Sequence, residues 1–373
     1  MRVKTVLRRT IQIAEPVLGR EELEAVREVF ESGMLVQGEK VKLFEEKFAE
    51  YIGVEHAVAV ANGTVALDVA LKTLGLSSGD EVVTSAFSFV ASSNCVLYQG
   101  AKPVFADIDR RSFNFDPLDV AEKITAKTKA IIPVHLFGQP ADMDGLNEIA
   151  KDKGIAVVED AAQSHGAEYT GRKTGSLGDV GCFSFYATKN LTTCEGGMIT
   201  TNDSELAKKA RLLRDHGQTE KYHHIILGYN YRMTEASAAV GLVQLRKLDR
   251  SNRRRNENAS LLTKEIEKIP SLTPPHTNDD VRHVFYQYVI RVEEDYPLKR
   301  NKLAEHLREE GIGVAVHYPT PIYRQPLYKE LGYEKTICPI AEEVCKRILS
   351  LPVHPSVTEE DTRYILDVLR KVQ

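Results

Sequence analysis

Residues 155–202 of the chain read IAVVEDAAQSHGAEYTGRKTGSLGDVGCFSFYATKNLTTCEGGMITTN, and the rest of the sequence is organised around them. The stretch opens with a short apolar run that stops at two carboxylates, Glu159 and Asp160. Lys189 follows in a predicted loop, between aromatic and serine residues on one side and a glycine pair on the other. Most loop lysines are solvated, but a loop this short of other charges favours a functional lysine. The stretch therefore predicts a buried strand that delivers a carboxylate and a loop that delivers a lysine.

Strands and helices alternate on both sides of this stretch. Short runs rich in Val, Ile and Ala predict strands at residues 57–62, 81–84, 102–107, 130–135, 178–185 and 197–201. Helices fill most of the gaps, which is typical of a mainly parallel sheet covered by helices on both faces. In such sheets ligands bind at the carboxyl ends of the strands. Thr64, Phe89, His135 and Asp160 come shortly after or at such ends, so we expect a ligand site there.

The segment after the first of these strands has the form of an anion site. Gly63 and Thr64 stand between the strand and a helical run at residues 65–71. The unpaired N–H groups and the dipole of a helix N-terminus attract negatively charged groups such as phosphate. Alternatively, Thr64 only caps the helix, as Ser and Thr commonly do. The segment alone leaves both interpretations open.

The length of 373 residues predicts two domains, because one core does not organise a chain of this size. A composition shift at residues 270–280 marks the start of a smaller unit. Two helices precede it, one at residues 234–248 and a long charged one at residues 252–269 that joins the units. We therefore expect a large α/β domain over residues 14–250 and a small C-terminal α+β domain over residues 251–373.

Further elements are predicted at both ends of the chain. Residues 20–32 should form an amphipathic helix whose apolar face carries Leu23, Val26 and Phe30. In the C-terminal part we expect strands at residues 284–292 and 313–316, and helices at residues 298–310, 340–350 and 359–372.

Composition and charge argue against several classes of function. The net charge of −4 gives no reason to expect nucleic-acid or anionic-membrane binding. The five cysteines are scattered without a C-x-x-C pair and no H-E-x-x-H occurs, so neither disulfides nor a metal site is expected. The N-terminus is basic, at Arg2, Lys4, Arg8 and Arg9, but no long apolar stretch follows. We expect a cytoplasmic protein without a signal peptide or a membrane span.

The lysine and the carboxylate together match the requirements of pyridoxal phosphate chemistry. A lysine binds the cofactor's aldehyde as a Schiff base and then transfers protons. A carboxylate keeps the pyridine nitrogen protonated, an aromatic ring stacks on the cofactor, and hydroxyl and backbone N–H groups hold the phosphate. The sequence offers side chains for every role: Lys189 for the aldehyde, Asp160 or Glu159 for the nitrogen, Phe89 or Phe87 for the stack, Gly63, Thr64 and Ser184 for the phosphate, and Gln163 for the ring hydroxyl. Because neighbouring residues of a strand point in opposite directions, only one of the two carboxylates can reach the ring.

Six motifs resemble those of a known family. They read ANGTVAL, SAFSFVASSN, VHLFGQPADMD, VVEDAAQSHGA, GRKTGSLGDVGCFSFYATKNLTTCEGG and GYNYRM. They are similar to motifs of the DegT/StrS family of fold-type-I pyridoxal phosphate enzymes, the sugar aminotransferases, and the resemblance runs from about residue 14 to the C-terminus. It implies a large domain with a mainly parallel seven-stranded sheet between helices, and a smaller α+β domain. One departure is Cys194, where relatives commonly have glycine.

The resemblance also implies roles for individual residues. Lys189 would carry the Schiff base, and Asp160 would pair with the ring nitrogen. The remaining cofactor contacts of the same chain would be Gly63, Thr64, Phe89, Gln163 and Ser184. The Asn of the GYNYRM motif, Asn230, would reach the cofactor of a neighbouring subunit, which implies a homodimer with shared active sites. The implied substrate contacts are His165, Arg232, His317, Tyr318 and Tyr323, with Arg232 suited to the carboxylate of the amino donor.

The implied activity is the transfer of an amino group from an amino acid, with glutamate as the expected donor. The acceptor would be the C3 or C4 keto group of a nucleotide-linked deoxy-sugar, in polysaccharide biosynthesis. Relatives that dehydrate sugars carry His in place of the lysine, so Lys189 favours transfer. Two alternatives stay open: another fold-type-I activity such as a desulfurase or lyase, and a regulator that binds pyridoxal phosphate without turnover. A nicotinamide-dependent Rossmann enzyme is disfavoured because the chain has no G-x-G-x-x-G motif.

Overall fold

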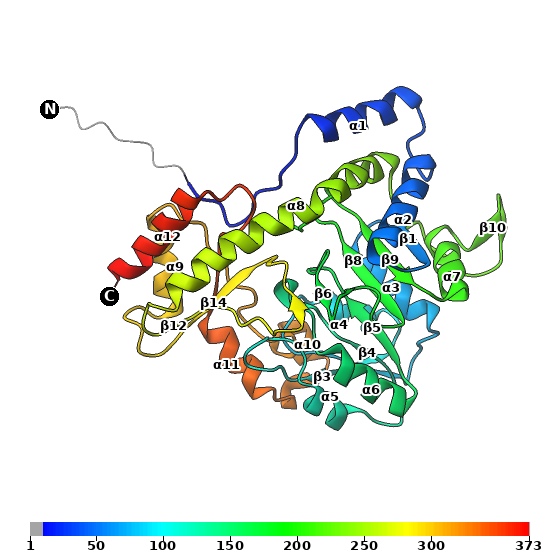
Figure 1. Cartoon of the computed structure of the whole chain (residues 1–373). Helices are drawn as coiled ribbons and strands as arrows, with labels where there is room; N and C mark the ends of the chain where they lie inside the picture. The colour runs from blue at the N-terminus through cyan, green and yellow to red at the C-terminus, as the bar shows by residue number, and fades with distance from the viewer. Residues whose placement is uncertain (1–9, 373) are drawn as a thin grey trace.

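Seven strands form the central sheet of the computed structural model, which describes residues 10–372 (Figure 1). Their order across the sheet is β1-β9-β8-β5-β4-β2-β3, with the bounds β1 (His56–Val60), β2 (Glu81–Ser85), β3 (Lys102–Ala106), β4 (Thr128–Ile132), β5 (Ala156–Asp160), β8 (Val180–Ser184) and β9 (Gly197–Thr201). Strand β9 is antiparallel to β1 and β8, and the other neighbouring strands are parallel. The predicted mainly parallel seven-stranded sheet is confirmed. The basic residues Arg2, Lys4, Arg8 and Arg9 lie outside the described residues.

Helices cover both faces of the sheet because its strands are apolar on both faces. Ile132 and Val158 pack in the cluster that contains α3, α4 and α7, whereas their neighbours Ile131 and Val157 pack on the opposite face with α5 and α6. Helices α2 and α8 cover the β1–β9–β8 end of that second face. The bounds of these helices are α2 (Glu39–Ile52), α3 (Gly63–Thr73), α4 (Ala91–Leu97), α5 (Pro117–Lys123), α6 (Met143–Lys153), α7 (Ser204–Arg214) and α8 (Glu235–Ile266).

Helix α8 is a single helix where two were predicted, at residues 234–248 and 252–269. No glycine or proline stands between the two predicted helices, so nothing interrupts the backbone hydrogen bonds. Its N-terminal half packs against α1 (Arg20–Ser32) and α2, and its C-terminal half packs against the C-terminal helix α12 (Glu359–Lys371) (Figure 1). The expected boundary at residue 250 therefore falls inside a continuous helix.

The C-terminal part contains a small antiparallel sheet in the order β12-β14-β15. Its elements are β12 (Leu272–Thr273), β14 (Tyr288–Val292), α9 (Arg300–Glu309), α11 (Pro339–Arg347), β15 (Ile348–Leu351) and α12 (Glu359–Lys371). The prediction of a helix over residues 340–350 was wrong at its end, because Ile348 to Leu351 pair with β14 instead. The strand predicted at residues 313–316 is reduced to an isolated bridge between Ala315 and Ser350.

Buried aromatic residues join this part to the edge strand β3. The ring of Phe105, on β3, contacts Tyr323, Tyr328 and Tyr333 at centroid distances of 5.4–5.8 Å. These tyrosines lie on η2 (Ile322–Arg324), α10 (Pro326–Glu330) and η3 (Tyr333–Lys335). The remaining short elements are η1 (Leu136–Gly138), β6 (Glu168–Tyr169), β7 (Arg172–Lys173), β10 (Gln218–Glu220), β11 (His223–His224) and β13 (Val281–Arg282). Within residues 10–372 no helix combines the length and the apolar composition needed to cross a membrane.

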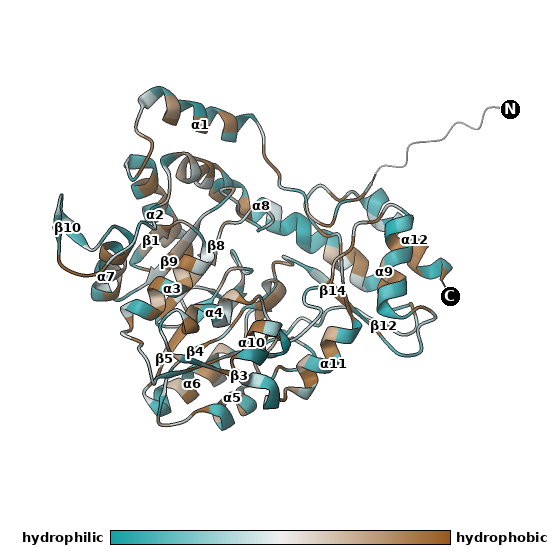
Figure 2. Ribbon diagram, turned by 180° about the vertical axis from the view of Figure 1, so that it is seen from behind, coloured by the Kyte–Doolittle hydropathy of each residue, from teal (hydrophilic) through white to brown (hydrophobic). Residues whose placement is uncertain are grey.

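Helix α1 (Arg20–Ser32) has the predicted bounds, but two of the three apolar residues expected on its buried face are exposed. Leu23 and Phe30, expected on the buried face, are 73% and 65% exposed. The buried side carries Glu22, whose carboxylate accepts hydrogen bonds from Gln244 and Lys247 of α8, both at 2.8 Å. These polar contacts fix the rotation of the helix, so its apolar stripe points outward. Figure 2 shows hydrophobic and hydrophilic residues alternating along α1.

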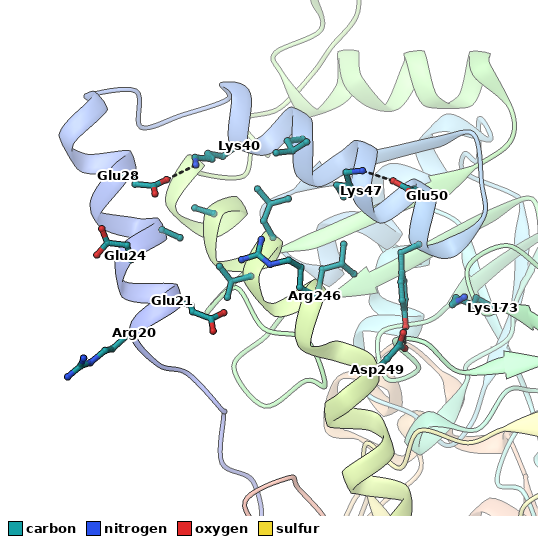
Figure 3. Close-up of a pocket in the computed structure, with 17 residues that line it drawn as sticks. Arg20, Glu21, Glu24, Glu28, Lys40, Lys47, Glu50, Lys173, Arg246 and Asp249 are labelled. Atoms are coloured by element: carbon teal, nitrogen blue, oxygen red, sulfur yellow. Dashed lines mark hydrogen bonds and ion pairs between the residues drawn. The ribbon is translucent and has the colours of Figure 1, made fainter.

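A groove with a volume of about 1110 Å³ lies between α1, α2 and α8 (Figure 3). Two ion pairs cross its lining, between Lys40 and Glu28 and between Lys47 and Glu50. The hydroxyl of Tyr51 donates to Asp249 at 2.7 Å. These side chains do not form a cluster of reactive groups. The groove is therefore not the candidate active site, despite its size.

Glu235, the first residue of α8, should be one of the residues on which stability depends most. It is buried, and its carboxylate accepts the N–H groups of Gly38, Lys40 and Val41 at 2.8–2.9 Å, capping α2. Glu235→Ala should lower the free energy of unfolding by about 2–4 kcal/mol in urea denaturation, because it leaves buried donors unpaired. As a control, Glu39→Ala at the exposed start of α2 should cost about 1 kcal/mol or less. Equal losses in the two variants would contradict this role.

Candidate active site

A cavity of about 910 Å³ opens at the carboxyl ends of the parallel strands. It collects nine residues predicted from the sequence: Gly63, Thr64, Phe89, Asp160, Gln163, Ser184, Lys189, His317 and Tyr318. Each of the first seven follows or ends a strand of the central sheet, which is where a parallel sheet places its ligands. Phe89 is 55% exposed to this cavity, whereas Phe87 is buried among other aromatic rings. Phe89 is therefore the ring available for stacking.

The two carboxylates at the end of β5 have separate roles. Glu159 is fully buried and accepts hydrogen bonds from His135 at 2.8 Å and from the N–H groups of Gly175, Leu177 and Gly178 at 2.6–2.7 Å. His135 uses its other ring nitrogen to accept the N–H of Ala141, so neither group faces the cavity. Glu159 therefore has a structural role, whereas Asp160 is the carboxylate that lines the cavity.

Asp160 has hydrogen-bond donors but no cationic side chain beside it among the described residues. Its carboxylate accepts hydrogen bonds from the Ser92 hydroxyl at 2.7 Å and from the N–H of Ala162 at 3.2 Å. Among residues 10–372 no lysine, arginine or histidine forms an ion pair with it. Burial, and then the charge of Asp160, raises the pKa of the thiols of Cys95 and Cys182 well above the usual value. The carboxylate is thus available to a cationic ring nitrogen.

The N-terminus of α3 forms an anion cradle. The side chain of Asn62 accepts the N–H of Val65 at 2.9 Å, so Asn62 caps the helix and Thr64 is left to face the cavity. A Cβ at Gly63 would lie 2.6 Å from the Cβ of Ser184, and one at Gly197 would lie 2.4 Å from the carbonyl oxygen of Asn62. Only glycines permit this approach, which brings the Ser184 hydroxyl beside the helix N-terminus.

Lys189 lies on the loop between β8 and β9. Its backbone N–H donates to the carbonyl of Tyr186 at 2.9 Å, and its Nζ lies 4.3 Å from the centroid of the Tyr286 ring. Cys194, at the end of the loop, has a φ of 69°, a left-handed conformation that glycine adopts without strain. The backbone here therefore accounts for the glycine that is common at this position in the resembling family.

Gln163 and its neighbours form the far wall of the cavity. Its Oε1 accepts the N–H of Phe137 at 2.8 Å, and its Nε2 donates to the Tyr318 hydroxyl at 3.2 Å. Because an amide nitrogen carries two hydrogens, one remains for a ligand. Burial, and then the charge of Lys189, lowers the pKa of His317, which keeps the imidazole neutral at neutral pH.

Four predicted residues do not line this cavity. His165 is buried against Phe183 and Phe185, and burial lowers its pKa to about 3. Tyr323 is buried and donates its hydroxyl hydrogen to Glu342 at 2.7 Å. Both side chains are enclosed by protein, so the expectation that they contact the sugar directly does not agree with the structure. Arg232 is paired with Asp215, and Asn230 is exposed outside the cavity of its own chain.

Tyr286 also lines the cavity, together with Tyr98, Tyr186, Glu195 and Tyr231, and the sequence patterns did not predict it there. The segment that carries Tyr286 was predicted as the start of a strand at residues 284–292, but the strand begins only at Tyr288. The aromatic run at residues 285–288 was the one available signal, and it did not specify which ring faces the lysine.

The groups of this cavity fit pyridoxal phosphate. The α3 N-terminus with Thr64 and Ser184 suits a phosphate, and Asp160 suits a protonated pyridine nitrogen. Lys189, the ring of Phe89 and the free amide hydrogen of Gln163 complete the set of contacts. Among residues 10–372 no group of three His, Cys, Asp or Glu residues could hold a metal ion.

Comparisons with known proteins agree with this chemistry. The model of the DegT/DnrJ/EryC1/StrS aminotransferase family matches residues 16–370. A "pleiotropic regulatory protein" of Geobacillus stearothermophilus is 43% identical, with 93% of each chain covered. A GDP-perosamine synthase of Caulobacter vibrioides is 40% identical over 97% of this chain and 98% of its own. The crystal structure of DesV from S. venezuelae superimposes with a TM-score of 0.90 at 38% identity, covering 94% of each chain.

Replacing either carboxylate of β5 by its amide should affect a different property of the protein. Asp160→Asn should abolish catalysis and weaken cofactor binding, while changing the unfolding free energy of the cofactor-free protein by only about 1 kcal/mol. Glu159→Gln should instead destabilise that protein by about 2–4 kcal/mol, because an amide cannot accept all four hydrogen bonds. Urea denaturation and cofactor titration measure the two effects. A larger loss of stability in Asp160→Asn than in Glu159→Gln would reverse the assignment.

Proposed function

Because the chain belongs to the DegT/DnrJ/EryC1/StrS aminotransferase family, we propose that it aminates the C3 or C4 keto group of a nucleotide-linked deoxy-sugar. The chain is a pyridoxal phosphate-dependent sugar aminotransferase. The observation that carries the proposal is the cavity in which Lys189 and Asp160 face the same space beside an anion cradle. The name of the GDP-perosamine synthase, similar over nearly the whole chain, supports a nucleotide-linked substrate. Glutamate is the proposed amino donor.

The residues of the chain have distinct tasks in this reaction. Pyridoxal phosphate, when bound, supplies an electron sink for the carbanion that amino transfer requires. With the cofactor bound, Asp160 would hold a proton on the ring nitrogen, Gln163 would donate to the ring hydroxyl, and Phe89 would cover one ring face. Lys189 removes the proton from the carbon of the donor and later delivers one to the carbon of the sugar. The low-dielectric walls of the cavity strengthen each of these contacts.

We also propose a homodimer in which Asn230 completes the partner's site. Asn230 is exposed, does not line the cavity of its own chain, and follows a hairpin formed by β10 and β11. Figure 1 shows this hairpin projecting from the body of the molecule. Tyr222 and Leu227, in and after the hairpin, are both 81% exposed, and the apolar stripe of α1 is exposed as well. Exposed apolar surfaces of this kind support burial against a second copy of the chain.

A regulator without turnover is the second candidate, because the relative from Geobacillus stearothermophilus is named a pleiotropic regulatory protein. Cofactor binding alone would need the phosphate cradle and the ring contacts. It would not need a cavity large enough for a second ligand beside Lys189 and Asp160. The catalytic set therefore favours turnover, and the two candidates make different predictions.

The purified protein should bind pyridoxal phosphate on Lys189, and borohydride reduction should fix the cofactor there, as identified by peptide mass spectrometry. Glutamate should convert the bound cofactor to its amine form, and a 3-keto or 4-keto nucleotide sugar should restore the aldehyde form. Lys189→Ala should show no measurable turnover, because the proton carrier is lost. If no amino acid converts the cofactor although it binds at Lys189, the protein is a regulator rather than an aminotransferase.

Subunit mixing should show whether Asn230 acts in the partner's site. Lys189→Ala and Asn230→Ala homodimers should each have little activity, but mixing them should restore it. In the mixed dimer one site carries both changes and the other carries neither, so an equal mixture should reach about a quarter of wild-type activity. If mixing restores nothing while exchange of subunits is verified by mass spectrometry, Asn230 serves the site of its own chain or none.

A further inference from the structure

The amino group of Lys189 lies against the ring of Tyr286. Its Nζ is 4.3 Å from the ring centroid, the distance of a cation–π contact. The Tyr286 hydroxyl lies 3.1 Å from the Thr188 hydroxyl, so residues 188 and 189 both contact this one side chain. Tyr286 lines the cavity, and its side chain is partly buried. None of the roles described above for the cofactor or the substrate uses it.

The segment that carries Tyr286 is held firmly in place. Val284 and Gln287 donate their N–H groups to the carbonyls of Gly138 and Phe137, at 3.0 and 3.2 Å. Three side chains also donate hydrogen bonds of 3.0–3.2 Å to carbonyl groups of this segment. Asn190 donates to residue 284, Arg255 to residue 285 and Asn256 to residue 283. The Tyr286 ring therefore has little freedom to move away from the lysine.

Two of these contacts link the segment to the loop of Lys189 and to Gln163. Asn190 follows Lys189 in the chain and donates to the carbonyl of Val284, so the lysine loop and the tyrosine segment are fixed to each other. Phe137, whose carbonyl receives the N–H of Gln287, also donates its own N–H to Gln163. Tyr286 is thus placed by the same backbone that places Gln163.

The electrostatics of the cavity distinguish Tyr286 from its neighbour Tyr318. Burial opposes ionisation of Tyr286, but the charge of Lys189 and hydrogen bonds from Thr188 and Lys189 outweigh it, so the pKa lies below its usual value. Burial, and then the nearby Tyr286, raises the pKa of Tyr318, whose hydroxyl is occupied by Gln163. The two phenols therefore serve different partners.

We propose that Tyr286 is a positioning residue that holds the amino group of Lys189 whenever that nitrogen is not bonded to the cofactor. The inference rests on the proposed amino transfer, in which the nitrogen of the donor replaces the nitrogen of the lysine on the cofactor. The released amine must then stay within reach of the carbon atoms whose protons it moves. The ring of Tyr286 attracts the protonated amine, and its hydroxyl hydrogen-bonds the same group. The lysine is retained at the cavity wall instead of turning toward solvent.

The contact itself can be tested on the cofactor-free protein by ultraviolet titration of its phenols. Wild type should contain one phenol that ionises at lower pH than the others, and Tyr286→Phe should remove it. Lys189→Met should shift its ionisation to higher pH, because the neighbouring charge is lost. Tyr288→Phe is the matched control. The Tyr288 hydroxyl lies outside the cavity, where it forms a hydrogen bond of 2.8 Å with the Thr263 hydroxyl. A phenol titration that does not respond to Lys189→Met would overturn the proposed contact, whatever reaction the protein catalyses.

The role in amino transfer requires the loaded enzyme and a single turnover with glutamate. Tyr286→Leu should slow this half-reaction about ten-fold, while Tyr286→Phe, which keeps the ring, should slow it about three-fold or less. Affinity for pyridoxal phosphate should change less than about two-fold in both, because Tyr286 is proposed to hold the lysine rather than the cofactor. Equal rates in Tyr286→Leu and wild type, or a rate loss matched by loss of cofactor, would refute the role. If Tyr286→Leu does not fold, the positioning role is refuted by two results together: an unchanged rate in Tyr286→Phe, and a phenol titration that does not respond to Lys189→Met.

Discussion

The hydrogen bonds of the buried Glu159 carboxylate set the geometry on which the site depends. They tie the end of β5 to His135, which follows β4, and to the loop at residues 175–178 that leads into β8. The end of β5 is thereby joined to the segment that follows β4 and to the segment that enters β8, its two neighbours in the sheet. Because successive side chains of a strand point to opposite sides, anchoring Glu159 on one side directs Asp160 into the cavity. The strand that follows the anchored loop then carries Ser184 and leads to Lys189.

The charges within the cavity are separated and few. The carboxylates in its lining are Asp160 and Glu195 and the amine is Lys189, while burial lowers the pKa of His317 and raises that of Tyr318, so both are neutral at neutral pH. In a partly buried space, opposite charges of this kind act strongly on a ligand that lies between them. The anion cradle at α3 contributes backbone dipoles instead of a further charged side chain, so a phosphate binds without neutralising Asp160.

The sequence predicted those features that depend on local patterns. Strands with apolar residues on both faces, and functional residues at strand ends, follow from periodicity and from the properties of parallel sheets, which is why Asp160, Thr64 and Lys189 were found. Features that depend on distant contacts were not predictable in this way. The outward stripe of α1 is set by Glu22 and α8, the strand β15 exists only through its pairing with β14, and Tyr286 reaches Lys189 only through tertiary contacts. The burial of His165 and Tyr323 likewise comes from tertiary packing, which a motif does not reveal.

The continuity of α8 has a consequence for how substrates enter. A helix of 32 residues is a rod about 48 Å long, and each of its turns is hydrogen-bonded to the next. Bending it near residue 250 would break several of these bonds at once, so the helix resists a hinge motion at this point. The aromatic contacts of Phe105 with Tyr323 and Tyr328 resist the same movement on the other side. We therefore expect the admission of a sugar nucleotide and the release of the product to depend on short loops rather than on a closure of the large and small parts.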